Sequence, residues 1–263
     1  MTKVKKKMIL LSLLTVAVLV LSGCSSVENQ EGFFYSIFVR PFASSLIYLG
    51  DLFGGSYGLA IVAITVVIRL ILMPFMLRTY KRQQGMKVKM DKLRPEMEDI
   101  QKRLKETKDK EEQMKIQQEM MGLYKKHDVN PLNMGCLPVV IQMPIIMGLY
   151  FAILYAPDYV KDHEFLWFTL GSPDILMTLI AGAVYFFQAR VSLWTMPEQQ
   201  QKQMKLFIYI SPIMIMFVSF SSMAALPVYW AVGGILLIIQ TFIGRKFYSN
   251  HPEVALESVE EKK

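Results

Sequence analysis

The feature that most constrains this chain is an apolar stretch, residues 58–77, that contains a single charged residue, Arg69. At a rise of 1.5 Å per residue, a helix of this length spans about 30 Å, the thickness of a bilayer's hydrocarbon core. Arginine cannot be neutralised there because its pKa is too high, and at a helix centre it costs about 2.5–3.5 kcal/mol on insertion scales. The stretch therefore predicts a membrane helix whose charge has a function.

Composition extends this prediction to the whole chain. With 263 residues that are 53% hydrophobic, the chain is too apolar for an ordinary soluble domain. Four further apolar segments are long enough to span or nearly span a bilayer. We predict an all-α membrane protein with five transmembrane helices, at residues 57–77, 136–155, 174–193, 206–222 and 226–244.

The N-terminus has the form of a processing signal. A lysine-rich start and an apolar region lead to Leu21-Ser22-Gly23-Cys24, which resembles a bacterial lipobox. We predict a lipoprotein signal peptide over 1–23, with Cys24 lipid-modified as the new N-terminus. The alternative is an ordinary signal peptide with an incidental cysteine. Residues 24–56 would form an extracytoplasmic segment with an interfacial helix near 32–50.

The distribution of lysine and arginine predicts the orientation. Residues 78–133 hold fifteen of them, whereas the loop 156–173 holds only Lys161. By the positive-inside rule, 78–135, 194–205 and the tail 245–263 are cytoplasmic, and 156–173 is extracytoplasmic. Five spans that start outside end inside, which agrees with the lipobox argument. We therefore expect a multi-pass protein of the bacterial cell membrane with its lipid-anchored N-terminus outside.

The segment 78–135 is the largest polar part of the chain. Two apolar stripes at helical spacing, separated by a polar turn at 107–110, predict a cytoplasmic helical hairpin. The stripes are Met90, Leu93, Met97, Ile100 and Leu104, then Ile116, Met120 and Leu123. Packing of the two helices against each other explains most of these residues. The hairpin's excess of positive charge also favours anionic lipid heads or ribosomal RNA, without recognition of a specific nucleic-acid sequence.

Several polar side chains lie inside the predicted spans. Thr65 and Arg69 share one face of the first span, and other spans contribute Gln142, Gln188 and Gln240. Each glutamine could form an interhelical hydrogen bond or line a wet cavity. No span interior contains Asp or Glu, so Arg69 has no carboxylate partner there. This favours a transiently bound anionic group over a structural ion pair.

The chain carries no soluble-enzyme motif, and its three histidines have no metal-ligand spacing. We therefore expect neither an enzyme nor a cofactor or metal.

One motif resembles a known family. The stretch Asn130-Pro-Leu-Asn-Met-Gly-Cys-Leu-Pro-Val-Val-Ile-Gln-Met-Pro-Ile145 is similar to the second-span signature of the YidC family of membrane protein insertases. Arg69, the charged hairpin and Leu226-Pro-Val-Tyr-Trp230 support the match, which covers about residues 33–248. The lipobox and the short outer segment resemble the Gram-positive branch.

The resemblance implies a function and a site. It implies five helices around a hydrophilic groove, in which Arg69 attracts acidic segments of nascent membrane proteins. The implied groove residues are Arg69, Thr65, Gln142, Gln188, Trp230 and Gln240. Implied partners are nascent membrane proteins and membrane lipid, with the Sec translocon, the ribosome and signal recognition components as further candidates. Two departures are Gly234, where many relatives have Asn, and a short mixed-charge tail in place of a long basic one.

Two other functions remain open at this point. The chain could be a small transporter or anion channel with Arg69 as its selectivity charge, although an odd number of spans and the absence of an internal repeat argue against it. It could also be a scaffold whose hairpin recruits partners. Ion flux through the pure protein would identify a channel, and deletion of residues 82–126 would test the scaffold.

Overall fold

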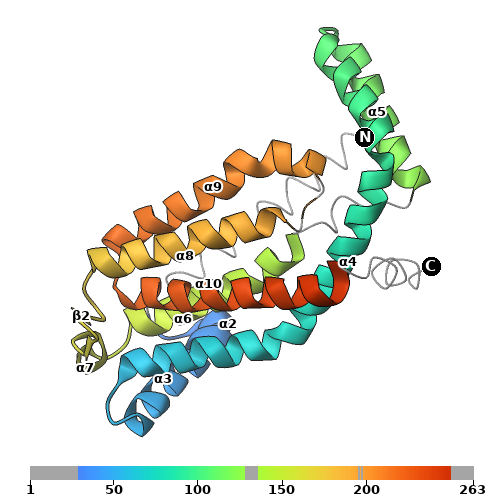
Figure 1. Ribbon diagram of the computed structural model, residues 1–263. Coiled ribbons are helices and arrows are strands. Elements are labelled where there is room, and N and C mark those ends of the chain that lie inside the picture. The colour runs from blue at the N-terminus through green and yellow to red at the C-terminus, as the bar shows by residue number, and fades with distance from the viewer. Residues whose placement is uncertain (1–28, 128–135, 195, 197, 250–263) are drawn as a thin grey trace.

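The computed structural model describes residues 29–127, 136–194, 196 and 198–249. Within this part nearly all regular structure is helical, in agreement with the predicted all-α class. The signal peptide, Cys24, residues 130–135 of the 130–145 motif and the tail beyond residue 249 lie outside the described residues, so the predictions for these segments stay untested. The helices form two bodies, a bundle and a projecting hairpin (Figure 1).

The bundle is built from five long helices that lie side by side (Figure 1). They are the first part of α4 (Tyr57–Glu106), α6 (Cys136–Leu154), α8 (Ile175–Leu193), α9 (Glu198–Ser221) and α10 (Ala225–Gly244). α10 packs against both α4 and α8, and α8 packs against α9. α10 therefore occupies the centre of the bundle, where it brings α4 and α8 to opposite sides of one helix.

A helical segment precedes the bundle. α2 (Gly32–Phe34), the π-helix η1 (Tyr35–Val39) and α3 (Arg40–Leu52) follow one another without a break and pack on α4 and α6. Gly54 and Gly55 then turn the chain into α4 with φ of +67° and +92°, values that glycine adopts without strain. This segment was predicted to be an interfacial helix, and in the structure Gly32–Leu52 is helical and long and apolar enough to cross a membrane.

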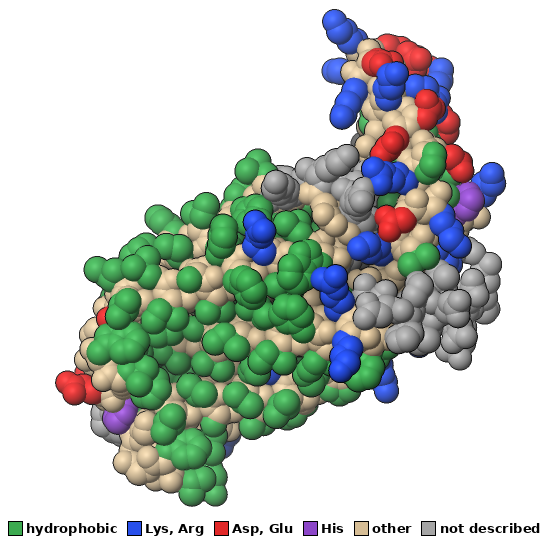
Figure 2. Space-filling view, viewed as in Figure 1, with side chains coloured by type: hydrophobic (Ala, Val, Ile, Leu, Met, Phe, Trp, Pro, Cys, Tyr) green, Lys and Arg blue, Asp and Glu red, His purple; other side chains and the backbone are tan. Residues whose placement is uncertain are grey.

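Length and composition identify the helices that could cross a membrane. Within the described residues, four stretches are long and apolar enough, and two further apolar helices are shorter. The four are Gly32–Leu52, Tyr57–Glu106, Ile175–Leu193 and Ala225–Tyr248, and the shorter two are Gln142–Leu154 and Ile208–Ser221. Hydrophobic side chains cover the visible face of the bundle, as expected of a surface that meets lipid (Figure 2).

Short elements close the end of the bundle opposite the hairpin. α7 (Asp158–Lys161) leads into an antiparallel pair of strands, β1 (Glu164–Phe165) and β2 (Phe168–Thr169). Asp174 then caps α8, because its carboxylate accepts a hydrogen bond from the Met177 amide at 2.6 Å. The same carboxylate accepts a hydrogen bond from the Trp167 indole at 3.2 Å, which ties the strand pair to the start of α8.

The hairpin consists of the second part of α4 and α5 (Lys110–Lys126). The two stripes predicted from the sequence pack against each other in one apolar cluster, which confirms their interpretation as a hairpin core. The polar turn between α4 and α5 also falls where it was predicted. α4 runs from the bundle into the hairpin as one 50-residue helix that contains Pro74 and Pro95, whereas the sequence did not distinguish a kink at Pro95 from a new helix start.

Candidate functional site

The candidate site is centred on Arg69, in the bundle part of α4. The side chain is buried, with 7% of its surface exposed. Thr65 lies one helical turn earlier and is also buried, and its hydroxyl donates to the Ile61 carbonyl at 2.7 Å. The predicted shared face of Thr65 and Arg69 therefore points into the bundle. The hydrogen bond of the Thr65 hydroxyl stays within α4.

Arg69 lies directly against the backbone of α10 at Gly233. A Cβ atom added to Gly233 would stand 3.1 Å from Nη2 of Arg69 and 3.6 Å from its Nε. A side chain at this position would compete with the guanidinium for the same space. Gly233 thus allows a long charged side chain to pack between two close helices.

Two tyrosines complete the surroundings of the guanidinium. Tyr185 on α8 and Tyr229 on α10 are both close enough to interact electrostatically with the charge of Arg69. Tyr229 also accepts a hydrogen bond from Nε2 of Gln142 on α6 at 2.8 Å. The site therefore draws on four helices, α4, α6, α8 and α10, and includes two tyrosines.

The remaining predicted residues, Gln188, Trp230 and Gln240, have other surroundings. Gln188 donates to the Ser192 hydroxyl at 2.8 Å on its own helix. Gln240 is half-buried on α10, seven residues after Gly233, which is about 10 Å further along the helix axis. Trp230 is buried in the main apolar cluster of the bundle. Among the described residues, no hydrogen bond joins Gln188, Trp230 or Gln240 to Arg69.

Sequence reasoning missed Tyr185, Tyr229 and Gly233 as site residues. One signal was available, because Tyr229 and Gly233 are four residues apart and so share a face of α10. Nothing in the sequence alone showed that this face meets Arg69. Gly234, a departure from the family pattern, packs on α8 instead, where an added Cβ would stand 2.7 Å from Cγ1 of Val184.

The arrangement is suited to binding an anion. Residues 57–77, 136–154, 175–193, 206–221 and 225–244 contain no Asp or Glu, so no carboxylate within these segments can neutralise Arg69. A guanidinium offers a planar fork of donors that matches a carboxylate. Among the described residues no cluster of His, Cys, Asp or Glu is arranged to hold a metal.

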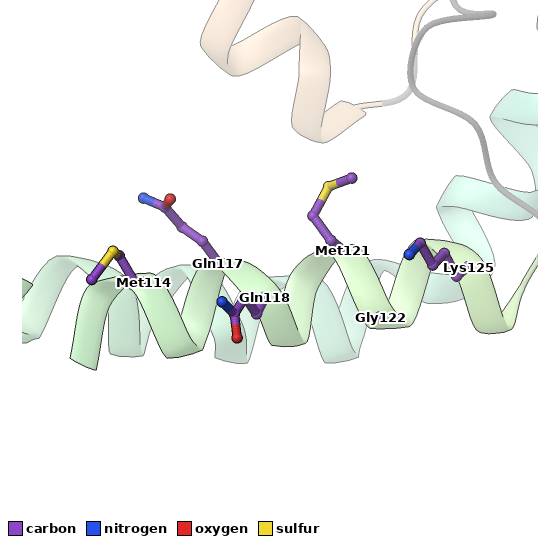
Figure 3. Close-up of a pocket in the computed structure, with 6 residues that line it drawn as sticks. All are labelled: Met114, Gln117, Gln118, Met121, Gly122 and Lys125. Atoms are coloured by element: carbon purple, nitrogen blue, oxygen red, sulfur yellow. The ribbon is translucent and has the colours of Figure 1, made fainter. Parts of the chain in front are cut away.

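A second surface lies on the hairpin. One face of α5 borders an open hollow of about 470 Å³ (Figure 3). Its lining consists of Met114, Gln117, Gln118, Met121, Gly122 and Lys125. Met114 and Met121 are 57% and 47% exposed, and methionine adapts to differently shaped partners.

The fold and the buried arginine define a class, a helical membrane protein with a positively charged interior site. Residues 48–251 match the family model described as 60Kd inner membrane protein. The chain belongs to this family, the YidC family of membrane proteins.

Similar proteins support this assignment. The chain is 48% identical to "Membrane protein insertase YidC 2" of Listeria monocytogenes serotype 4b (strain F2365), over 98% of this chain and 94% of the relative. It is 45% identical to "Membrane protein insertase YidC" of Staphylococcus carnosus (strain TM300), over 93% of this chain and 86% of the relative.

The fold also resembles a solved structure, described as an active YidC insertase crystal structure with the first transmembrane domain resolved. The TM-score is 0.58 at 24% identity, and the match covers 85% of this chain but 50% of that protein. This likeness concerns the fold. The helical architecture is thus supported both by the family and by a solved relative.

Proposed function

We propose that this chain is a membrane protein insertase that uses Arg69 to attract acidic segments of nascent membrane proteins. The family match and the names of its relatives support the insertase activity. The observation that carries the role of Arg69 is a buried arginine, 7% exposed, in a bundle whose apolar segments 57–77, 136–154, 175–193, 206–221 and 225–244 contain no Asp or Glu. An anionic side chain in transit would supply the missing partner.

The position of Arg69 in the bundle implies an order of steps for insertion of a substrate. A substrate's acidic tail or loop would enter from the hairpin side and pair with Arg69, which lowers the cost of moving charge part of the way across the membrane. The substrate's apolar segment would then leave along the apolar outer surface of the bundle, and its burial in lipid would drive completion. Tyr185, Tyr229 and Gln142 would provide polar contacts beside the arginine. Neither nucleotide nor cofactor is needed for this path.

We further propose the predicted topology and partners. Cys24 would carry the lipid outside, and the hairpin and the tail would be cytoplasmic. The methionine-bearing face of α5 (Figure 3) would receive substrate or contact the ribosome, signal recognition components or the Sec translocon. Labelling of single cysteines at 110 and 166 from each side of intact vesicles tests the topology, since these positions should react from opposite sides.

The test of the Arg69 role is insertion into vesicles reconstituted with the pure protein. Arg69→Ala and Arg69→Glu should abolish most insertion of a single-span substrate with an acidic tail. Arg69→Lys should retain much of it, because positive charge is the main requirement. Arg78→Ala is a matched control, since it removes an exposed arginine from the same helix.

A second substrate sharpens this test. The same single-span protein with a neutral tail should depend much less on Arg69, because it offers no carboxylate to attract. Normal insertion of the acidic substrate by Arg69→Ala would refute the proposed role. Solute flux through the unmodified protein would instead support the channel alternative.

A further inference from the structure

A patch of aromatic and basic side chains lies where the bundle meets the hairpin. Trp194 ends α8, and its ring centroid is 5.9 Å from that of Phe242 on α10. The guanidinium carbon of Arg245 lies 5.1 Å from the same ring, in a cation–π contact. We call Arg190, Trp194, Arg245 and Lys246 the Trp194 patch.

The patch is fixed in position and still exposed. Lys87 on α4 donates to the Trp194 carbonyl at 3.2 Å, so α4, α8 and α10 all hold this residue. The Trp194 side chain is nevertheless 44% exposed, and Arg245 and Lys246 are also exposed. A ring and a guanidinium held together at the surface lose little further freedom when a ligand binds.

The positive charge of the patch is not balanced by acidic residues on the helical segments that carry it. Arg190 lies one helical turn before Trp194 on α8 and is exposed. Neither residues 175–193 nor residues 225–249 contain Asp or Glu. Three basic side chains and one aromatic ring therefore lie at the ends of α8 and α10, and residues 175–193 and 225–249 offer them no acidic partner.

The surroundings indicate which anion would bind. Ile239 and Phe242 near the end of α10 and Phe247 just after it are 45%, 46% and 59% exposed, so exposed apolar residues lie close in sequence to Arg245 and Lys246. Figure 2 shows basic side chains at the edge where the apolar surface of the bundle gives way to the hairpin. A ligand that is apolar along its length and anionic at its head fits this boundary.

We propose that the Trp194 patch binds the phosphate headgroup of an anionic lipid in the leaflet on the hairpin side. Arg190, Arg245 and Lys246 contact the phosphate, and the acyl chains lie along the exposed apolar residues of α10. Trp194 supplies the interfacial ring that is favoured at headgroup depth. The inference is independent of the role of Arg69, because it concerns the outer surface of the bundle.

The test is a lipid titration of the full-length protein by native mass spectrometry in detergent. Phosphatidylglycerol is compared with phosphatidylcholine of identical acyl chains. The variant Arg190→Gln/Arg245→Gln should bind the first phosphatidylglycerol roughly 10- to 30-fold more weakly, from the usual contribution of two basic residues near an anionic surface. Phosphatidylcholine binding should not change. Trp194→Leu should weaken phosphatidylglycerol binding less, because Arg245 then loses only the aromatic ring that positions its guanidinium.

The matched control is Lys105→Gln/Lys110→Gln, which removes the same charge from exposed positions of the hairpin. An equal loss in this control would show that net charge, and not the patch, holds the lipid. Unchanged lipid binding in the patch variant, at an unchanged melting temperature, would overturn the site. Displacement of the lipid by inorganic phosphate or by a short RNA at equal concentration would assign the site to those ligands instead.

Discussion

At the scale of single residues, the close packing of the bundle helices depends on two adjacent glycines of α10. Gly233 leaves room for the guanidinium of Arg69, and Gly234 lets α10 approach α8. Adjacent residues of one helix thus serve two different neighbours. Gly234 cannot contribute a polar side chain to the site. The space that such a side chain would fill is taken by Val184 and Tyr185 of α8.

Gly234→Ala should destabilise the bundle. The new methyl group would stand 2.7 Å from Cγ1 of Val184 and 3.2 Å from a ring carbon of Tyr185, so α8 and α10 must separate. We expect a loss of about 1–3 kcal/mol, the usual cost of overpacking. Unfolding in a graded series of denaturing detergent measures it.

Gly122→Ala is the control for that substitution. Gly122 is helical, and nothing lies within 4 Å of an added Cβ. The hairpin should therefore gain about 0.5–1 kcal/mol from the better helix propensity of alanine. Equal effects of the two substitutions would contradict the packing argument.

The Gln142–Tyr229 hydrogen bond gives a second residue-scale prediction. It joins α6 to α10 at 2.8 Å. In a double-mutant cycle of Gln142→Leu and Tyr229→Phe, we expect a coupling energy of about 0.6 kcal/mol, the average for interhelical hydrogen bonds in membranes. Detergent unfolding of the four proteins measures it, and strictly additive effects would show that the bond contributes nothing.

At the scale of elements, the hairpin is stabilised by an apolar stripe and by charges at defined positions. Asp109 caps α5 by accepting from the Glu111 amide at 3.2 Å. Glu111 and Glu112 lie in its first turn and Lys125 and Lys126 in its last, which suits the helix dipole. Arg103 on α4 pairs with Glu119 on α5 at 2.6 Å and so links the two arms.

The Arg103–Glu119 pair predicts a pH response of the hairpin. The hydrogen bond from Arg103 holds the pKa of the Glu119 carboxyl below its usual value of 4.5. A lowered pKa in the folded state means that the pair stabilises the hairpin above pH 4.5 and that this contribution is lost as pH falls through the folded pKa. The effect is small and sensitive to salt, because both side chains are exposed.

Spin labels at positions 92 and 125 of the full-length protein can follow this response. Their distance distribution should broaden below pH 4.5 in the unmodified sequence, as the arms begin to separate. Glu119→Gln should broaden it already at neutral pH and weaken the further change in acid. Glu112→Gln, which removes another exposed carboxylate of α5, should behave like the unmodified protein.

At the scale of the whole molecule, the chain has separate cores for the bundle and the hairpin. The main apolar cluster of the bundle and the cluster of the hairpin share no residue. α4 belongs to both, so the hairpin is joined to the bundle by a continuous helix. Motion of the hairpin would therefore act on the same helix that carries Arg69.

Replacing residues 91–126 with a flexible Gly/Ser linker should leave the bundle folded. The bundle core keeps all its residues, and the Lys87 contact with Trp194 also remains. We expect an unchanged thermal transition of the bundle and residual, Arg69-dependent insertion of acidic-tailed substrates. Complete loss of insertion with a folded bundle would favour the scaffold hypothesis, in which the hairpin alone acts by recruiting partners.

The sequence by itself determined the helical class, most of the helix positions in the described part, the hairpin and the charged residue at the centre of the site. These are properties of local composition and of helical periodicity, which a linear pattern contains. Family membership could also be inferred from one motif and was then confirmed by the comparisons.

Only the tertiary structure decided which residues surround Arg69. Tyr185, Tyr229 and Gly233 reach it because α10 packs between α4 and α8, and Gln142 joins Tyr229 from a position 87 residues away in the chain. The continuity of α4 through Pro95 was likewise decided by packing, since the stripe on both sides of the proline buries against α5. Contacts between distant segments depend on which helix faces meet, and no local pattern contains that information.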